Sequence, residues 1–177
     1  EQLVRLRNAL RRAEYQNLVD PTTGLPGPRL VEEQLRALLR RTDEWALIRS
    51  SLRGFKAFNA VYGFLAGEEV LRFAAQVFSQ TMEQLGGHDD FLGHAGGDNF
   101  IIITTLDRMA ALSPALRERF DAGVRAHYSF RDRGQGFMLV KAADGAAERV
   151  PLMTLHVQTV TSAQGPFYDI MELTQGG

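Results

Sequence analysis

Apolar residues at the start of the chain recur with the period of a helix. They stand at spacings of three, four and three among arginines and polar residues, at Leu3, Leu6, Leu10 and Ala13. This spacing predicts a helix over residues 1–19 with a heptad-like apolar stripe. Two heptads leave two interpretations open: the helix pairs with a partner, or it lies on its own domain.

A segment rich in proline and glycine then divides the chain. Residues 20–28 read D-P-T-T-G-L-P-G-P, so the N-terminal helix must end and the chain must turn. We therefore expect an appendage over residues 1–19 and one domain over residues 20–177. A second helix is expected after the turn, because one side of it carries Leu30, Leu35, Leu38 and Leu39.

The next apolar runs predict a buried strand and a long helix. Residues 45–48 read W-A-L-I, which suits a buried strand, and the polar stretch R-S-S-L-R follows at residues 49–53. Gly67 precedes two acidic residues that favour a helix N-terminus, and apolar residues then recur at helical spacing until Gly86. The end of the strand is where side chains are expected to meet a ligand.

Glycines mark a hairpin in the middle of the chain. Two extended segments, residues 91–95 and 100–105, are joined by G-G-D-N, and glycine can adopt the positive φ that such a turn needs. Farther on, Ser113 and Pro114 are predicted to open a helix as N-cap and first residue. Further strands are expected over residues 136–141 and 150–160.

One stretch between these elements combines aromatic and basic residues. Residues 128–137 read Y-S-F-R-D-R-G-Q-G-F. Two interpretations are open: a partner-binding loop, or a solvated loop with two aromatic side chains in the core. Because polar connections that contain glycine lie on protein surfaces, we favour the second.

Composition narrows the class of protein. The 177 residues include 20 Lys and Arg against 21 Asp and Glu, a net charge of −1, which argues against nucleic-acid binding as the main function. There is no cysteine, so disulfides and thiolate chemistry are excluded. No apolar run approaches the roughly 18 residues of a membrane span. We expect a cytoplasmic domain, whose parent protein can still be membrane-anchored.

Three motifs stand in sequential order along the chain. Residues 20–29 read D-P-T-T-G-L-P-G-P-R, residues 55–68 read F-K-A-F-N-A-V-Y-G-F-L-A-G-E, and residues 96–100 read G-G-D-N-F. Together they resemble the GGDEF family, the diguanylate cyclase domains of bacterial signalling proteins. The first is similar to the family's opening D-x-L-T-G-L-P-N-R, and the second matches F-K-x-I-N-D-x-x-G-H-x-x-G-D at the aromatic, Lys, Asn and Gly positions. The third stands where the signature G-G-[DE]-E-F belongs.

The resemblance implies an α+β fold with a central antiparallel sheet flanked by helices, similar to the nucleotide-cyclase palm. It also implies that residues 1–19 form a signalling helix, through which the domain pairs with a copy or with another signalling domain. The family joins two GTP molecules into cyclic di-GMP with Mg²⁺ or Mn²⁺. The family's late helix with Lys and Arg, which helps to hold phosphates, has no counterpart before Gly177.

At the family's catalytic positions the sequence departs from the pattern. The resemblance places the metal at Asp98, at the backbone carbonyl of Leu52 and at Ser51, where the family has an acid. Arg53 replaces a second acid, and Asn99 replaces the Glu of the signature. A hydroxyl cannot neutralise a dication as a carboxylate does, and an amide cannot act as a general base. We expect metal binding and catalysis to be impaired.

The positions that hold the nucleotide are better preserved. The resemblance implies that Asn59 and Glu68 contact guanine, that Lys56 meets a phosphate, and that the signature glycines Gly96 and Gly97 lie against the nucleotide. In the alternative, Asn59 caps a turn, Glu68 caps a helix and Lys56 is solvated. Mg²⁺ or Mn²⁺ is expected only if the nucleotide binds.

The family's inhibitory site for cyclic di-GMP, Arg-x-x-Asp, has lost its arginine. Gly87 and Asp90 occupy its two positions. Since the guanidinium pairs with phosphate, an acid alone is a poor anion receptor, and we expect this site to be absent. His94, where the family commonly has Arg, is expected to be a neutral side chain that points off the hairpin, with pH sensing as the alternative.

Three functional hypotheses follow. The favoured one is a degenerate GGDEF domain of a larger bacterial sensor or response regulator, which senses GTP or mediates dimerisation without turning GTP over. The second is a slow diguanylate cyclase in which Asp98 and backbone carbonyls suffice for metal. The third is an interaction module without nucleotide affinity.

Overall fold

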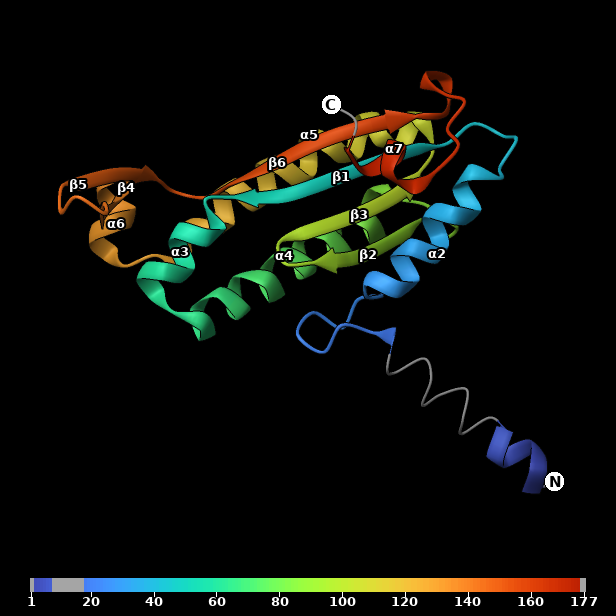
Figure 1. Ribbon diagram of the computed structural model, residues 1–177, viewed down its shortest axis with the longest axis horizontal. Coiled ribbons are helices and arrows are strands. Elements are labelled where there is room, and N and C mark those ends of the chain that lie inside the picture. The colour runs from blue at the N-terminus through green and yellow to red at the C-terminus, as the bar shows by residue number, and fades with distance from the viewer. Residues whose placement is uncertain (1, 8–17, 176–177) are drawn as a thin grey trace.

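The computed structural model describes residues 2–7 and 18–175, and its centre is a four-stranded antiparallel sheet (Figure 1). The strand order is β2-β3-β1-β6, so that β1 lies between partners from distant parts of the chain. The strands are β1 (Ala46–Arg53), β2 (Phe91–Gly96), β3 (Asn99–Thr104) and β6 (Thr154–Thr161). The predicted α+β class with a central antiparallel sheet is confirmed.

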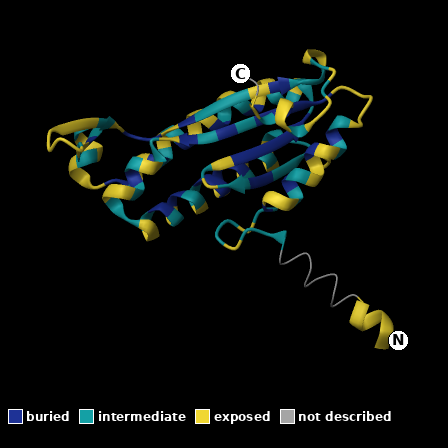
Figure 2. Ribbon diagram, in the orientation of Figure 1, coloured by how far each residue is buried: buried dark blue, intermediate teal, exposed yellow. Residues whose placement is uncertain are grey.

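Helices cover both faces of the sheet, because each strand sends alternate residues to opposite sides. Ile48 and Leu52 of β1 join a core beneath two long helices, and Leu47 joins a second core on the other face. Figure 2 shows buried residues along the central strands. In Figure 1 the long helices lie behind the sheet and the other two in front. The helices are α4 (Phe64–Leu85) and α5 (Leu106–Gly123) behind, and α2 (Pro28–Leu39) and α7 (Ile170–Gln175) in front.

A small lobe extends from one end of the sheet, at the left of Figure 1. It consists of η1 (Val124–His127), α6 (Phe130–Gln135) and the hairpin of β4 (Phe137–Lys141) and β5 (Ala147–Pro151). Tyr128 is buried there, whereas Phe130 is 86% exposed and Phe137 is half-buried under the Arg149 guanidinium. The expectation that the aromatic residues of 128–137 pack into the core therefore holds for Tyr128 and fails for Phe130.

The start of α5 corrects a sequence prediction. The helix begins at Leu106, where Thr105 is the N-cap and its side chain accepts a hydrogen bond from the Arg108 amide at 3.4 Å. Ser113 and Pro114 therefore lie inside the helix and do not open it. Proline lacks the N–H of one helical bond, but Leu112 and Leu116 on either side are fully buried, and this packing carries the helix through the proline.

Two other boundaries also differ from the predictions. Gly63, with φ of 94°, separates α3 (Phe55–Tyr62) from α4, so α4 begins at Phe64 and contains Gly67. The strand expected over residues 150–160 is divided between β5 and β6. Leu152 and Met153, between these strands, turn their side chains into the core and interrupt the ladder.

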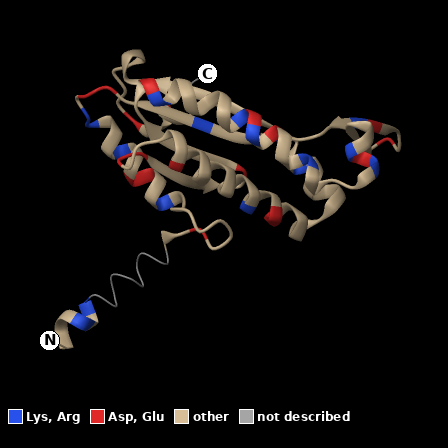
Figure 3. Cartoon of the chain, turned by 180° about the vertical axis from the view of Figure 1, so that it is seen from behind, with Lys and Arg blue, Asp and Glu red and all other residues tan. Residues whose placement is uncertain are grey.

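Within the described residues, 2–7 are helical, and Leu3 and Leu6 of the predicted stripe are exposed. Leu10 and Ala13 of that stripe lie outside the described residues. No described helix is long and apolar enough to span a membrane. Seen from behind, the charged residues lie mostly on helices and loops, and the central strands carry few of them (Figure 3).

Candidate functional site

The turn between β2 and β3 holds the only acid among the predicted metal-binding residues, Asp98. Gly96 and Gly97 adopt φ of 104° and 55°, as the sequence predicts for this turn. Asp98 Oδ2 accepts a hydrogen bond from the Leu52 amide at 3.0 Å, immediately beyond the last register pair of β1 with β3. The Asp98 carboxylate therefore links the hairpin to the end of β1 by a hydrogen bond, a role that the sequence did not predict.

Beside this link, polar side chains form a row across three strands. Ser51 pairs with Asn99 of β3 on one side and with His156 of β6 on the other, and directly paired residues share a face of the sheet. Two residues along β1, Arg53 donates a hydrogen bond to His156 Nδ1 at 2.8 Å. We call Ser51, Arg53, Asn99 and His156 the strand-end cluster.

A cavity of about 380 Å³ opens on this row. Arg49 reaches it from β1 and donates to Gln158 Oε1 at 2.7 Å, and burial lowers the pKa of this guanidinium from its ordinary value. No acidic residue of the described chain lines the cavity. Its lining residues include Arg49, Ser51, Asn99, His156, Gln158 and Thr174.

These residues do not fit a magnesium ion. Magnesium prefers carboxylate and carbonyl oxygens, and the strand end offers the single carboxylate of Asp98, one oxygen of which holds the Leu52 amide. Arg53 places a permanent positive charge next to the position of Ser51. Among the described residues, no group of three or more His, Cys, Asp or Glu could hold a metal.

The predicted guanine-contacting residues lie on α3 and α4, which meet at Gly63. The Asn59 side chain packs against Gly67 so closely that a Cβ added to this glycine would lie 1.7 Å from Asn59 Oδ1. Glu68 follows Gly67, and its Oε2 lies 3.6 Å from Nη2 of Arg72 on the same helix. The structure thus brings the Asn59 side chain against Gly67 in the first turn of α4, one residue before Glu68, while Lys56 is exposed at the start of α3.

Aromatic packing fixes α3. Phe58 is fully buried, stacks on Tyr62 at 4.6 Å between ring centroids, and meets the edge of Tyr128 at 5.1 Å. The Tyr62 hydroxyl also donates to Asp132 and accepts from the Ser129 amide at 3.0 Å. The helix that carries Asn59 and Lys56 is therefore held by the small lobe.

His94 is buried, contrary to the expectation that it points off the hairpin; its side chain is 5% exposed. Its Nε2 lies 2.7 Å from the Gly97 carbonyl, and because a carbonyl only accepts, Nε2 must carry the proton of that bond. Its Nδ1 lies 3.3 Å from Asp20 Oδ2, an ion-pair distance without the alignment of a hydrogen bond. The imidazole thus connects the turn after the N-terminal helix with the signature hairpin.

Asp20 organises that turn. Its carboxylate accepts hydrogen bonds from both the amide and the hydroxyl of Thr23, each at 2.7 Å. Partial burial acts to raise the pKa of Asp20, but the Thr23 hydrogen bonds and the nearby His94 outweigh it, so that the pKa lies below its ordinary value.

At the predicted inhibitory position, both carboxylate oxygens of Asp90 already have partners within the chain. Its Oδ2 accepts hydrogen bonds from the Gly87 amide at 2.8 Å and the Thr104 hydroxyl at 2.7 Å, and Arg108 pairs with Oδ1 at 3.1 Å. A Cβ at Gly87 would lie only 2.1 Å from Arg108 Nη1. The guanidinium beside Asp90 therefore comes from α5, which no local motif could reveal. The absence of inhibition through this site stays a prediction.

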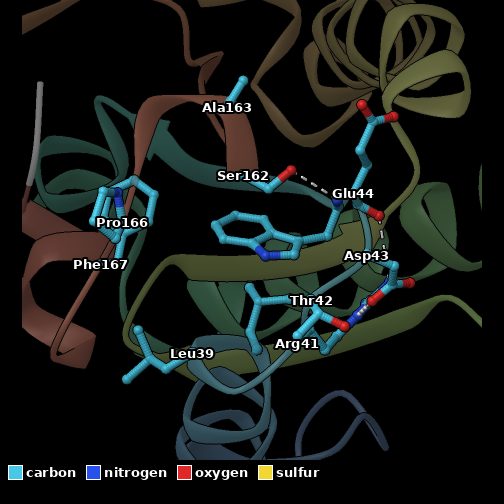
Figure 4. A pocket seen from close by; sticks show the side chains of 11 residues that line it. Leu39, Arg41, Thr42, Asp43, Glu44, Ser162, Ala163, Pro166 and Phe167 are labelled. Atoms are coloured by element: carbon cyan, nitrogen blue, oxygen red, sulfur yellow. Dashed lines mark hydrogen bonds and ion pairs between the residues drawn. The ribbon is translucent and has the colours of Figure 1, made fainter.

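A second pocket, of about 360 Å³, lies beside the start of β1 (Figure 4). Ser162 Oγ accepts from the Trp45 amide at 3.1 Å, and Arg41 forms a two-point ion pair with Asp43 at the rim. None of the predicted site residues lines this pocket. The predicted site residues of β1 lie at its opposite end.

Comparison with known proteins matches the part of the chain that contains the predicted site residues. A family model described as "Diguanylate cyclase, GGDEF domain" matches residues 17–136. The diguanylate cyclase DgcP of Escherichia coli (strain K12) is 30% identical over 131 residues, which cover 72% of this chain and 37% of that protein. The cyclic di-GMP phosphodiesterase PdeR of the same organism is 27% identical over 108 residues, 60% of this chain and 16% of that protein. The chain thus spans about a third or less of these two relatives.

Solved structures share the fold. The coiled coil and GGDEF domain of DgcB from Caulobacter crescentus, in complex with c-di-GMP, has a TM-score of 0.69 and 17% identity; the match covers 98% of this chain and 83% of that one. The S helix-GGDEF-EAL structure of Vibrio cholerae LapD, bound to c-di-GMP, has a TM-score of 0.68 and 11% identity over 97% of this chain and 35% of that one.

Proposed function

Because the chain belongs to the GGDEF family of diguanylate cyclase domains, we propose that it is a regulatory domain of cyclic di-GMP signalling that binds GTP and makes little or no cyclic di-GMP. The main support for this proposal is the set of residues at the end of β1. Ser51, Arg53 and Asn99 stand where the family pattern has acids, and the remaining acid holds the Leu52 amide.

The chemistry of the family explains why these changes matter. A 3′-hydroxyl must lose its proton and attack an α-phosphorus, while divalent metal neutralises the triphosphate. Cyclases of the family use Mg²⁺ or Mn²⁺ with GTP, but the residues at this strand end do not fit such an ion. Loss of one catalytic group typically costs about 10²- to 10⁴-fold in rate, so two such losses should reduce turnover by several powers of ten.

The helices support nucleotide binding without turnover. The Asn59 amide and the Glu68 carboxylate have the donors and acceptors that the Watson–Crick edge of guanine requires, and they lie at the junction of α3 and α4. Lys56 is exposed one turn before Asn59 and supplies a cation for phosphate. These residues would hold GTP where the strand end cannot process it.

Signals would reach this domain through residues 1–19. Leu3 and Leu6 expose their side chains, as a helix that pairs with a copy or with another signalling domain requires. His94 then connects Asp20, at the end of this segment, with the signature hairpin. The proposed parent is a cytoplasmic or membrane-anchored sensor or response regulator.

One experiment tests the proposal. The purified chain is incubated with GTP and Mg²⁺ or Mn²⁺, cyclic di-GMP is followed by chromatography, and GTP binding is measured by calorimetry on the same sample. We expect binding without turnover. Turnover at an ordinary enzyme rate of about 1 s⁻¹ or more would show an active cyclase, and absence of both binding and turnover would favour a pure interaction module.

A further inference from the structure

The replacements at the end of β1 remove acids and add a cation, beside the one acid that remains there, Asp98. Ser51 and Asn99 are neutral, and Arg53 is a cation that cannot lose its proton. Between residues 18 and 175, no carboxylate is in ion-pair contact with Arg53, whose hydrogen-bond partner is His156. The strand-end cluster therefore carries one positive charge, and the neighbouring Asp98 carboxylate accepts the Leu52 amide, an arrangement that favours an anion over a cation.

The contact between Arg53 and His156 fixes where protons lie. A guanidinium only donates, so His156 Nδ1 must be the acceptor and the ring proton must be on Nε2. The pair thus offers the remaining guanidinium hydrogens and an imidazole N–H. Both are donors, as a phosphate oxygen requires.

Two cavities adjoin His156 and extend this positive region. Arg49 lines the first, and the second, of about 460 Å³, is lined by Arg53 and Arg117. Asp121 is the acid that lines the second, and its Oδ1 accepts the Leu155 amide at 2.8 Å. Arginine outnumbers acid around both openings, so the surroundings reinforce the charge of Arg53.

We propose that the strand-end cluster has exchanged a metal site for a cationic one, which binds the triphosphate of GTP without a divalent ion. This inference rests on the proposed binding of GTP and adds how its phosphates are neutralised. Arg53 binds phosphate oxygens through its planar fork, and His156 donates a further hydrogen bond. Guanidinium and imidazole offset charge but activate no 3′-hydroxyl, so nucleotide is held and not converted.

The test measures binding to the whole chain by calorimetry, with GTP, guanosine and inorganic triphosphate as probes, each in excess EDTA and in Mg²⁺. We expect the GTP affinity to change by no more than about twofold between EDTA and Mg²⁺, and guanosine to bind at least about tenfold more weakly than GTP. Arg53→Ala should weaken GTP and triphosphate about tenfold and leave guanosine unchanged. Arg149→Ala, at an exposed strand arginine of the small lobe, is the matched control and should change none of these affinities.

The outcomes separate the two proposals. If GTP binds in Mg²⁺ but not in EDTA, or if Arg53→Ala binds GTP like the parent chain, the cationic site is wrong while GTP binding stands. If triphosphate binds, is weakened by Arg53→Ala and does not need metal, but GTP is no better than triphosphate, the cationic site stands and guanine recognition fails. If neither GTP nor triphosphate binds, both proposals are wrong.

Discussion

Two regions of this domain have diverged differently from the family pattern. At the junction of α3 and α4, the residues expected to contact guanine remain and are built into close packing, with Asn59 against Gly67. At the end of β1, acids are replaced and the cluster is positively charged. The first set lies on helices and the second at strand ends. Under the proposed function, GTP binding depends on the first set and turnover on the second.

The largest loss of GTP affinity should come from adding a side chain at the junction of α3 and α4. In Gly67→Ala the new Cβ would lie 1.7 Å from Asn59 Oδ1, so the amide must move away. We expect GTP affinity to fall about tenfold to a hundredfold, the cost of about 1–3 kcal/mol for a polar partner left unpaired. Calorimetry with GTP measures this loss.

Gly134→Ala provides the control for that variant. Gly134 is also helical, but a Cβ there meets nothing within 4 Å. It should leave GTP affinity unchanged and raise the free energy of unfolding by about 0.5–1 kcal/mol, since alanine favours a helix over glycine. Equal GTP affinity in both variants would remove the helix junction from the nucleotide site.

A smaller change should appear when acids are restored at the strand end. In Ser51→Asp combined with Asn99→Glu, the two carboxylates face each other across β1 and β3 beside Asp98. We expect Mn²⁺ affinity, measured by calorimetry, to rise about tenfold, as carboxylate oxygens suit such ions. An unchanged Mn²⁺ affinity would mean that the metal position implied by the family does not lie here.

The smallest effect concerns the turn that precedes both regions. The folded-state pKa of Asp20 is lowered, so its contribution to stability is present above the unfolded pKa of about 3.8 and is lost as pH falls through the folded pKa. Asp20→Asn should therefore be less stable than the parent near pH 7 and lose less stability on acidification. Urea unfolding at pH 7 and pH 3 measures both; Asp89→Asn, at an exposed acid, should behave like the parent.

Local patterns predicted most of the elements, but not the links between them. Helical spacing and short apolar runs predicted the main helices and strands, the two glycines predicted the signature turn, and the resemblance to the family implied the central sheet. The helix start predicted at Ser113 and Pro114 was wrong, because a proline that opens a helix and a proline inside a buried helix cannot be distinguished by local sequence. The contacts of Asp98 with Leu52, Asp20 with His94 and Asp90 with Arg108 join distant segments, so no spacing rule could reveal them.

The position of β1 also governs how the domain forms. The strand lies between β3 and β6, and its β6 partners, residues 154–161, follow it by about a hundred positions. Ribosomes add about 5–20 residues per second, so one edge of β1 stays unpaired for roughly 5–20 s of synthesis. Such non-local pairing is slow and leaves an open strand edge exposed to other chains. The apolar start of β1, residues 46–48, is therefore the segment that most needs protection on the nascent chain.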